Sequence, residues 1–323
     1  MAMRGWPLIK VLPVKTDLRF VSFAKYAAVL SAVLVIASLV GVFKPGMNLG
    51  IDFRGGAVME MTRDNGAVLD QGAVRSAVRD LGIGDVGVQG IDDASGAMVR
   101  FQVPEGRSQT EVVNQVQTAI TEAAGPVTFS GVSVVGSKVS SELFASGLMA
   151  LGAAVALMFA YIWFRFEPQF GLGAVAGLLH DVILVFGLIV VMRLEFNLNM
   201  VAAILTVIGY SMNDTVVVFD RLRENLRKYK TLPLREVIDL TINEILTRTI
   251  ITGFTAVMVL AALAFLGGPA LYGFSIALMF GIVVGTYSSI YVGAPIILLW
   301  GVKRGERDKE DTKPIKLGMA SRP

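Results

Sequence analysis

LNMVAAILTVIGYSMNDTVVVF, residues Leu198 to Phe219, is an almost continuous apolar stretch that holds one acidic residue, Asp214. A helix needs about 20 consecutive, mainly apolar residues to cross about 30 Å of hydrocarbon, and this stretch is long enough. Similar stretches recur along the chain, so we predict six transmembrane helices. Their residue ranges are 26–43, 144–164, 171–192, 198–219, 250–267 and 274–300.

The composition is typical of a membrane protein and excludes some chemistry. Hydrophobic residues make up 54% of the chain and charged residues 17%, outside the usual range of soluble domains. The chain has no cysteine and one histidine, so it cannot form disulfides or assemble the usual nitrogen and sulfur ligands of zinc. We therefore expect no metal and no bound cofactor.

Basic residues indicate the orientation of the helices. Short loops rich in Lys and Arg stay in the cytoplasm, whereas long domains are translocated regardless of charge. Basic residues concentrate in 220–249 and in the tail 301–323, and the basic segment 1–25 is typical of an uncleaved anchor. Both termini are then cytoplasmic. Residues 44–143 fall on the outer side, which is the periplasm in a bacterium with two membranes.

The outer segment has the pattern of a small α+β domain. Apolar patterning predicts strands at 57–62, 86–91, 98–103 and 127–135. One helix is predicted over 68–81, and a second follows a capping box formed by Ser108 and Glu111. The order β-α-β-β-α-β is that of a ferredoxin-like fold, which hosts many functions and proves none.

On the cytoplasmic side, Pro233–Leu246 has proline in its first turn and apolar residues toward one side. This pattern predicts an amphipathic surface helix. Two placements are open: the helix lies along the membrane, or it packs on the protein.

Two acidic residues in the predicted spans are the candidates for function. A charged group in a span costs about 2.5–3.5 kcal/mol on insertion scales, so it normally faces a bundle interior or a water path. Asp214 lies in the fourth span, and Asp181 lies beside His180 near the middle of the third. The alternative for each is a static polar contact that joins helices.

Arg248 stands just before the fifth span, where its long side chain can reach along the neighbouring helix toward Asp214. We expect an ion pair between them. Burial and the arginine act on the carboxyl group in opposite directions, and their balance favours a proton-binding site near working pH. Protonation would release Arg248 and let the helices reseat. A static salt bridge is the alternative.

Two aspartates on neighbouring spans also suggest an intramembrane aspartyl protease, which uses such a pair as acid and base. The local sequences argue against this, because those enzymes resemble Tyr-Asp on one helix and Gly-x-Gly-Asp on the next. Asp181 instead follows His180, and Asp214 follows Asn213. We therefore predict that the chain is not an enzyme.

Glycines four residues apart indicate close contacts between helices. The pairs are Gly173 with Gly177, and Gly281 with Gly285. Such spacings let helix backbones approach each other, and they do not distinguish static contacts from moving ones.

The run Asn48-Leu49-Gly50-Ile51-Asp52-Phe53-Arg54-Gly55-Gly56 resembles the signature of the SecD/SecF family of bacterial protein-export subunits. Its paired glycines permit a sharp backbone path where the chain leaves the bilayer for the first strand. Two interpretations of Asp52 and Arg54 are open: the side chains pair locally, or they belong to a plain turn. The signature residues are Gly50, Asp52, Arg54, Gly55 and Gly56.

Further stretches resemble the SecF branch of this family rather than the SecD branch. They are Trp163–Glu167, Leu179–Val182, Val207–Arg221 and Arg248–Thr252, with Gly253 where many members have serine. The resemblance marks the residues around the aspartates as supporting ones. These are His180, Tyr210, Ser211, Asn213 and Thr215.

The resemblance implies half of a transporter of the resistance-nodulation-division type in the bacterial inner membrane, paired with SecD. It associates Asp214 and Arg248 with proton conduction, and Asp181 is a further candidate for proton coupling. The proton-motive force would promote late translocation and release of unfolded polypeptide exported through SecYEG. YajC and membrane lipids are further expected partners, and nucleic acid is not.

A stand-alone proton-driven exporter of lipids or small hydrophobic molecules is the main alternative, because that superfamily shares the fold and the charged fourth helix. Length argues against it, since such exporters usually have twice as many spans and large porter domains. A passive scaffold is the third alternative.

Overall fold

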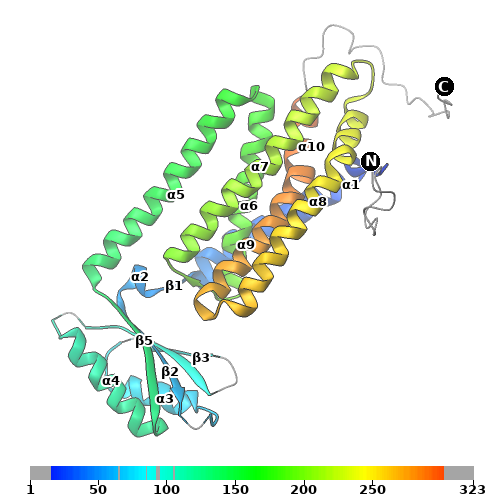
Figure 1. Ribbon diagram of the computed structural model, residues 1–323. Coiled ribbons are helices and arrows are strands. Elements are labelled where there is room, and N and C mark those ends of the chain that lie inside the picture. Colours follow the sequence, from blue (N-terminus) through cyan, green and yellow to red (C-terminus); the bar gives the residue numbers. More distant parts are fainter. Residues whose placement is uncertain (1–15, 65, 85, 92–94, 105, 302–323) are drawn as a thin grey trace, which may run out of the picture.

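The computed structural model describes residues 16–64, 66–84, 86–91, 95–104 and 106–301. Within these ranges, six helices are long and apolar enough to cross a membrane (Figure 1). They are α1 (Phe20–Gly41), α5 (Ser137–Arg165), α6 (Pro168–Val191), α7 (Leu198–Lys228), α8 (Leu234–Leu266) and the continuous unit of α9 (Pro269–Ser288), η2 (Ser289–Gly293) and α10 (Ala294–Trp300). The predicted multi-pass architecture is confirmed. The predicted cytoplasmic tail and much of the segment 1–25 lie outside the described residues.

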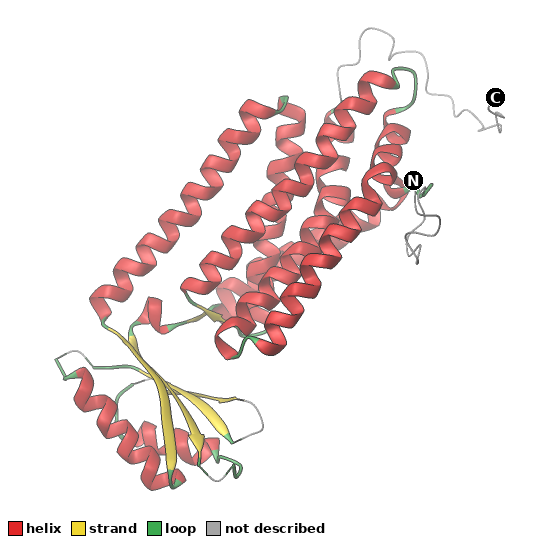
Figure 2. Cartoon of the chain, in the orientation of Figure 1, coloured by secondary structure: helices red, strands yellow, loops and turns green. Residues whose placement is uncertain are grey.

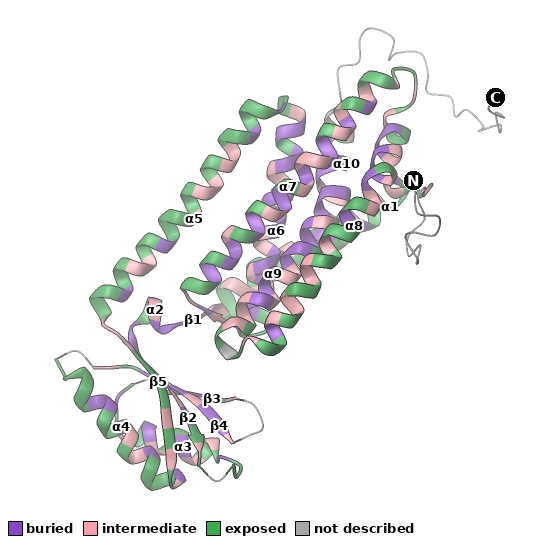
Figure 3. Ribbon diagram, viewed as in Figure 1, coloured by how far each residue is buried: buried purple, intermediate pink, exposed green. Residues whose placement is uncertain are grey.

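Helices α6, α7 and α9 form the buried centre of the bundle, whereas α1, α5 and α8 keep large apolar surfaces exposed (Figure 3). Fully buried side chains such as Phe170, Ile204 and Phe219 fill the space between the central helices. The exposed apolar surface of the outer helices suits contact with lipid or with another membrane protein.

Helix α8 combines two segments that were predicted as separate helices. The predicted helix over Pro233–Leu246 is present and packs on the protein, which was one of the two open placements, but it is not a separate element because it continues directly into the fifth span. Val237 and Ile238 are buried in the bundle, and Thr241 accepts a hydrogen bond of 3.0 Å from Asn225 of α7. No glycine or proline interrupts this part of α8, so nothing turns the helix along the membrane.

The π-helical segment η2 lies in the last span between α9 and α10. Pro295 follows it, and a proline lacks an N–H and crowds the carbonyl of the residue four positions earlier. A wider turn before the proline relieves this crowding. As a result, Ser288 and Ser289 lie where the helical repeat changes.

The outer domain is a four-stranded antiparallel sheet with two helices packed on it (Figure 2). The strand order is β3-β4-β2-β5, which completes a ferredoxin-like βαββαβ fold as predicted. Its elements are β2 (Gly56–Arg63), α3 (Gln71–Asp80), β3 (Val86–Ile91), β4 (Gly96–Phe101), α4 (Gln109–Ala124) and β5 (Val127–Val135).

The two helices of this domain start differently. Asp70 caps α3, because its side chain accepts hydrogen bonds from the backbone of Gly72 and Ala73. Ser108 is the N-cap residue of α4, but the predicted capping box is not formed. Its side chain makes no cap hydrogen bond, and Glu111 contacts Gln115 instead.

Short elements connect the outer domain with the membrane helices. β1 (Asn48–Leu49) pairs in parallel with β6 (Glu195–Phe196), which lies between α6 and α7. The short helix α2 (Ile51–Arg54) follows β1 and leads into β2. The signature loop, Asn48–Gly56, therefore lies between the bundle and the sheet (Figure 1).

Candidate functional site

Asp181 lies in the centre of the bundle and has no exposed surface. Its Oδ1 atom lies 2.9 Å from Nδ1 of His180. Its Oδ2 atom accepts hydrogen bonds from Ser211 of α7 at 2.5 Å and from Ser288 of α9 at 2.7 Å. This one carboxylate therefore joins three central helices, α6, α7 and α9.

Asp214 lies about one turn along α7 from Ser211 and is half-buried. Its Oδ1 atom accepts a hydrogen bond of 3.1 Å from Thr249 of α8, and its Oδ2 atom accepts one of 3.0 Å from Ser289. A hydroxyl group donates to an ionised carboxylate and can accept from a protonated one. The site therefore suits a carboxyl group that changes its protonation state.

The adjacent residues Ser288 and Ser289 connect the surroundings of the two aspartates. Each serine also has an acceptor in its own helix: the carbonyl of Gly285 lies 3.1 Å from Ser288 Oγ, and that of Thr286 lies 3.0 Å from Ser289 Oγ. A serine has one proton to donate, so it can turn to its own helix when the aspartate is protonated. Neither protonation state then leaves a buried serine hydroxyl without an acceptor.

The predicted ion pair between Asp214 and Arg248 is absent from the ion pairs of the described residues, and Arg248 is exposed. Consecutive residues of a helix point about 100° apart. Thr249 of α8 contacts Asp214, and the preceding residue Arg248 lies near enough to interact electrostatically with this carboxyl group but beyond ion-pair distance. The prediction of a direct ion pair is therefore wrong for this state of the protein.

The supporting residues are not all brought together. His180 and Ser211 contact Asp181, and Thr215 is buried. Tyr210 is half-buried, and Asn213 is exposed on the surface of the bundle.

Sequence reasoning missed the hydroxyl groups around the two aspartates and His180. The available signal was a run of four consecutive hydroxyl side chains, Thr286 to Ser289, in an otherwise apolar span. The missed residues are Ser31, Thr249, Tyr287, Ser288 and Ser289.

Close contacts between helices place these groups, as the glycine spacing predicted. A Cβ atom on Gly281 would lie 2.3 Å from Val207 of α7, and one on Gly285 would lie 3.0 Å from Ser211. A Cβ atom on Gly173 would lie 2.6 Å from a backbone carbonyl of η2. Larger side chains at these positions would push apart the helices that carry the aspartates.

The signature loop holds the start of α7. Oδ2 of Asp52 accepts a hydrogen bond of 2.9 Å from the backbone N–H of Leu198, and Gly50 donates one of 2.9 Å to the carbonyl of Phe196. Of the two interpretations, the local pair of Asp52 with Arg54 is wrong, because this carboxylate accepts from an N–H group at the N-terminus of α7 instead. The loop thus connects the outer domain with the helix that carries Asp214.

The paired glycines turn the chain from α2 into β2. Gly55 and Gly56 have φ angles of 74° and 121°, which residues with a side chain rarely adopt. This agrees with the predicted sharp backbone path. Arg54, directly before them, is exposed.

A second contact connects the outer domain with the bundle. Arg100 of β4 forms an ion pair with Glu195 of β6 and a hydrogen bond of 3.4 Å with Asn48. Both charged side chains are mostly buried, with 22% and 24% exposed. Burial raises the pKa of Glu195, Arg100 opposes this shift, and Asp52 adds to it.

We expect the Arg100–Glu195 contact to weaken in acid. As the pH falls through the raised pKa, Glu195 takes up a proton and loses its attraction to Arg100, at a pH above the ordinary value of 4.5. A double-mutant cycle with Arg100→Ala and Glu195→Ala should give a coupling of roughly 1–2 kcal/mol near neutral pH and less in acid. Hydrogen exchange of the β4 amides in the membrane-reconstituted chain measures this coupling energy.

Acid changes the overall stability in the direction opposite to its effect on this coupling. A raised pKa means that the folded chain binds the Glu195 proton more tightly than the unfolded chain does. Between 4.5 and the raised pKa, acidification therefore adds stability through Glu195 while it removes the attraction to Arg100. A coupling that stays the same from neutral pH into this window would contradict the prediction.

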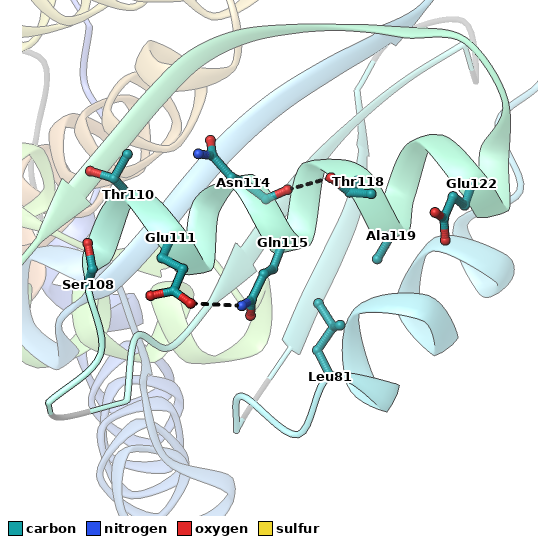
Figure 4. Close-up of a pocket in the computed structure, with 9 residues that line it drawn as sticks. All are labelled: Leu81, Ser108, Thr110, Glu111, Asn114, Gln115, Thr118, Ala119 and Glu122. Atoms are coloured by element: carbon teal, nitrogen blue, oxygen red, sulfur yellow. Dashed lines mark hydrogen bonds between the residues drawn. The ribbon is translucent and has the colours of Figure 1, made fainter.

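An open groove lies on the outer domain along α4 and the end of α3 (Figure 4). Its polar groups are partly paired already, since Gln115 donates to Glu111 and the Thr118 hydroxyl donates to the carbonyl of Asn114. The groove belongs to a different domain from both aspartates and forms no part of the candidate site. Its lining residues are Leu81, Ser108, Thr110, Glu111, Asn114, Gln115, Thr118, Ala119 and Glu122.

Comparison with known proteins places these features in one family. Residues 115–303, which contain both aspartates, match the C-terminal region of the protein export membrane proteins SecD/SecF. Residues 40–67, which contain the whole signature loop, match the SecD/SecF GG motif. The chain belongs to the SecD/SecF family.

Among the SecD/SecF relatives, several are named protein translocase subunit SecF. That of Cereibacter sphaeroides is 44% identical over 94% of this chain and 96% of its own length. That of Rhodobacter capsulatus is 42% identical over 94% of each chain, and that of Rickettsia bellii is 39% identical over 94% of this chain and 100% of its own. These names confirm the resemblance to the SecF branch.

Solved structures of this family agree with the fold. The crystal structure of SecDF from Thermus thermophilus, a translocon-associated membrane protein, matches with a TM-score of 0.80 and 30% identity. SecDF in a super-membrane-facing form matches with a TM-score of 0.64 and 29% identity. Each match covers 90% of this chain and 39% of the SecDF chain, so this chain spans well under half of SecDF. This chain is a multi-span accessory subunit of Sec protein translocation.

Proposed function

We propose that this chain, with a SecD partner, uses the proton-motive force to promote late translocation and release of polypeptides exported through SecYEG. The observation that carries the proposal is Asp214, a carboxyl group within the spans that joins three helices through hydroxyl groups. Protons are the coupling ion. The proposal needs no other cofactor, no metal and no enzymatic activity of this chain.

The surroundings of Asp214 support proton binding. An ionised carboxylate within a span is costly, and the hydroxyls of Thr249 and Ser289 compensate only part of this cost. A protonated Asp214 is neutral and can still bond to a hydroxyl group. Proton uptake therefore changes the contacts between α7, α8 and the last span, as a two-state element requires.

Asp181 and Arg248 complete the proposed proton-coupling residues. Asp181 contacts α7 and the last span through Ser211 and Ser288, and the Asp214 site uses the same helix and the same span. Arg248 directly precedes Thr249 in α8, and Thr249 donates a hydrogen bond to Asp214. A rotation of α8 would therefore replace this hydrogen bond by an ion pair between Arg248 and Asp214. We propose that this exchange occurs in another state of the complex.

The outer face of α7 and α8 supports the proposal of a SecD partner. Asn213 and Arg248 are exposed there, although hydrocarbon cannot pair with polar side chains. SecYEG supplies the channel in this proposal, and YajC is a further partner. The complex lies in the bacterial inner membrane with both termini in the cytoplasm and the outer domain in the periplasm.

Co-purification from native membranes tests the partners. Recovery of the chain with SecD and SecYEG is the expected result. Recovery as a self-contained oligomer that moves lipids or small hydrophobic molecules across liposomes would favour the stand-alone exporter instead. The names of the relatives support the export function.

A further inference from the structure

We propose that His180 and Asp181 together hold one exchangeable proton, and that Ser31 and Tyr287 determine which imidazole nitrogen carries it. The contacts that support this are Nδ1 of His180 to Asp181 at 2.9 Å, and Nε2 of His180 to Ser31 at 3.2 Å. This inference rests on the proposed function and adds detail to it. It assigns His180 a proton-carrying role and Ser31 and Tyr287 positioning roles.

The directions of the hydrogen bonds follow from counting protons. The hydroxyl of Tyr287 lies 2.9 Å from the backbone carbonyl of Ala27, which can only accept, so Tyr287 donates there. Ser31 lies 2.9 Å from the same hydroxyl and must then donate to it. The single proton of Ser31 is thereby used, so Nε2 of His180 must carry a proton and donate to Ser31.

With a proton on Nε2, the contact between Nδ1 and Asp181 also needs one. Two bare acceptors at 2.9 Å would repel each other. Either the imidazole is a cation and Asp181 is ionised, or the imidazole is neutral and Asp181 is protonated. In both cases the pair is neutral overall and has one proton between Nδ1 and Oδ1.

Loss of one proton reverses the chain of hydrogen bonds. Nδ1–H of a neutral His180 then donates to an ionised Asp181, and the bare Nε2 accepts from Ser31. Ser31 accepts in turn from Tyr287, which leaves the carbonyl of Ala27 to its helix bond. The Nε2–H bond is broken, and the proton goes to water; uptake from water is the reverse.

Burial favours the neutral form of the pair. His180 is 6% exposed and Asp181 is 0% exposed, so an uncompensated charge on either would be costly. The groups that face the pair are hydroxyls from α1, α7 and α9, with Tyr287 the titratable one and its ring stacked on His180 at 6.0 Å. Asp214, on the next turn of α7, contacts other hydroxyls. A charged state of the pair therefore has to be brief or driven.

The proposal is tested by nitrogen NMR of the full chain labelled with ¹⁵N-histidine in lipid nanodiscs. His180 is the one histidine of the sequence, so a purification tag without histidine leaves a single imidazole to observe. At neutral pH we expect a proton on Nε2 and a second proton shared between Nδ1 and Asp181, and after transfer to D₂O we expect the Nε2 proton to exchange with solvent. An imidazole whose Nε2 is bare, or whose Nε2 proton does not exchange, overturns the proposal.

Matched variants separate positioning from general damage. Ser31→Ala removes the partner of Nε2–H and should change which imidazole nitrogen carries the proton. Ser275→Ala removes a buried hydroxyl without a partner in the described residues and should leave the proton on Nε2. Equal effects of both variants would overturn the positioning role of Ser31.

A third variant separates this inference from the proposed function. Asp214→Asn should stop proton flux and leave the proton on Nε2 of His180 in place. If Asp214→Asn stops flux but Nε2 carries no exchangeable proton in the wild-type chain, the inference fails and the proposed function stands. If Nε2 carries this proton but Asp214→Asn leaves flux intact, the proposed function fails and the proton-binding pair stands.

Discussion

Replacing Asp214 by asparagine is expected to reduce proton flux through the complex to the level of protein-free liposomes. Asparagine has nearly the same shape, and its amide can keep contacts with Thr249 and Ser289. It cannot bind or release a proton, so the helices would stay in one arrangement. Flux is measured with a pH-sensitive dye in liposomes that contain the chain and its SecD partner, after an imposed pH gradient.

A matched control lies on the same helix. Asp220 also belongs to α7, but it is exposed and pairs with Arg165 at 2.6 Å. Asp220→Asn should leave flux near the wild-type level, because a surface ion pair contributes little. Both variants should still assemble with the partner. Normal flux in an assembled Asp214→Asn complex would leave the passive scaffold as the better explanation.

Replacing Gly56 by alanine is expected to destabilise the outer domain by roughly 2–5 kcal/mol. Two costs add at this position. The φ angle of 121° is rarely adopted by a residue with a Cβ atom, and that atom would lie 2.5 Å from the backbone carbonyl of Phe101. A backbone carbonyl within a sheet cannot move aside without breaking its strand pairing. Hydrogen exchange of the β2 and β4 amides in the full chain measures the loss.

Gly66→Ala separates these two costs. Gly66 also has a positive φ angle, 65°, but a Cβ atom there would meet no atom within 4 Å. Its destabilisation should be about 1–2 kcal/mol, from backbone strain alone. Equal effects of the two substitutions would show that contact with Phe101 does not constrain the signature loop.

The two aspartates were identifiable from the sequence, but most of their partners were not. A carboxyl group in an apolar stretch is conspicuous because its cost in hydrocarbon depends only on residue type and surroundings along the chain. Serine and threonine are different, since they satisfy their hydroxyls on their own helix and are common in spans. Ser31, Thr249 and Ser289 therefore carried no signal by themselves.

Two of the wrong predictions have the same origin. Arg248 and Thr249 are neighbours in sequence, yet a rotation of about 100° between them decides which one contacts Asp214. A local pair of Asp52 with Arg54 was one of two interpretations, but Asp52 contacts Leu198, which is far away in the chain. Both errors concern contacts between helices or between domains.

The sequence alone predicts the six spans, the βαββαβ order and the two intramembrane acidic residues. These depend on the length and periodicity of apolar segments, which are local properties. Only the tertiary structure decides that hydroxyl groups surround the acids, that α8 is continuous, and that the signature loop holds α7. Those features depend on how helices rotate and pack against distant segments, and local residue patterns do not encode the rotation.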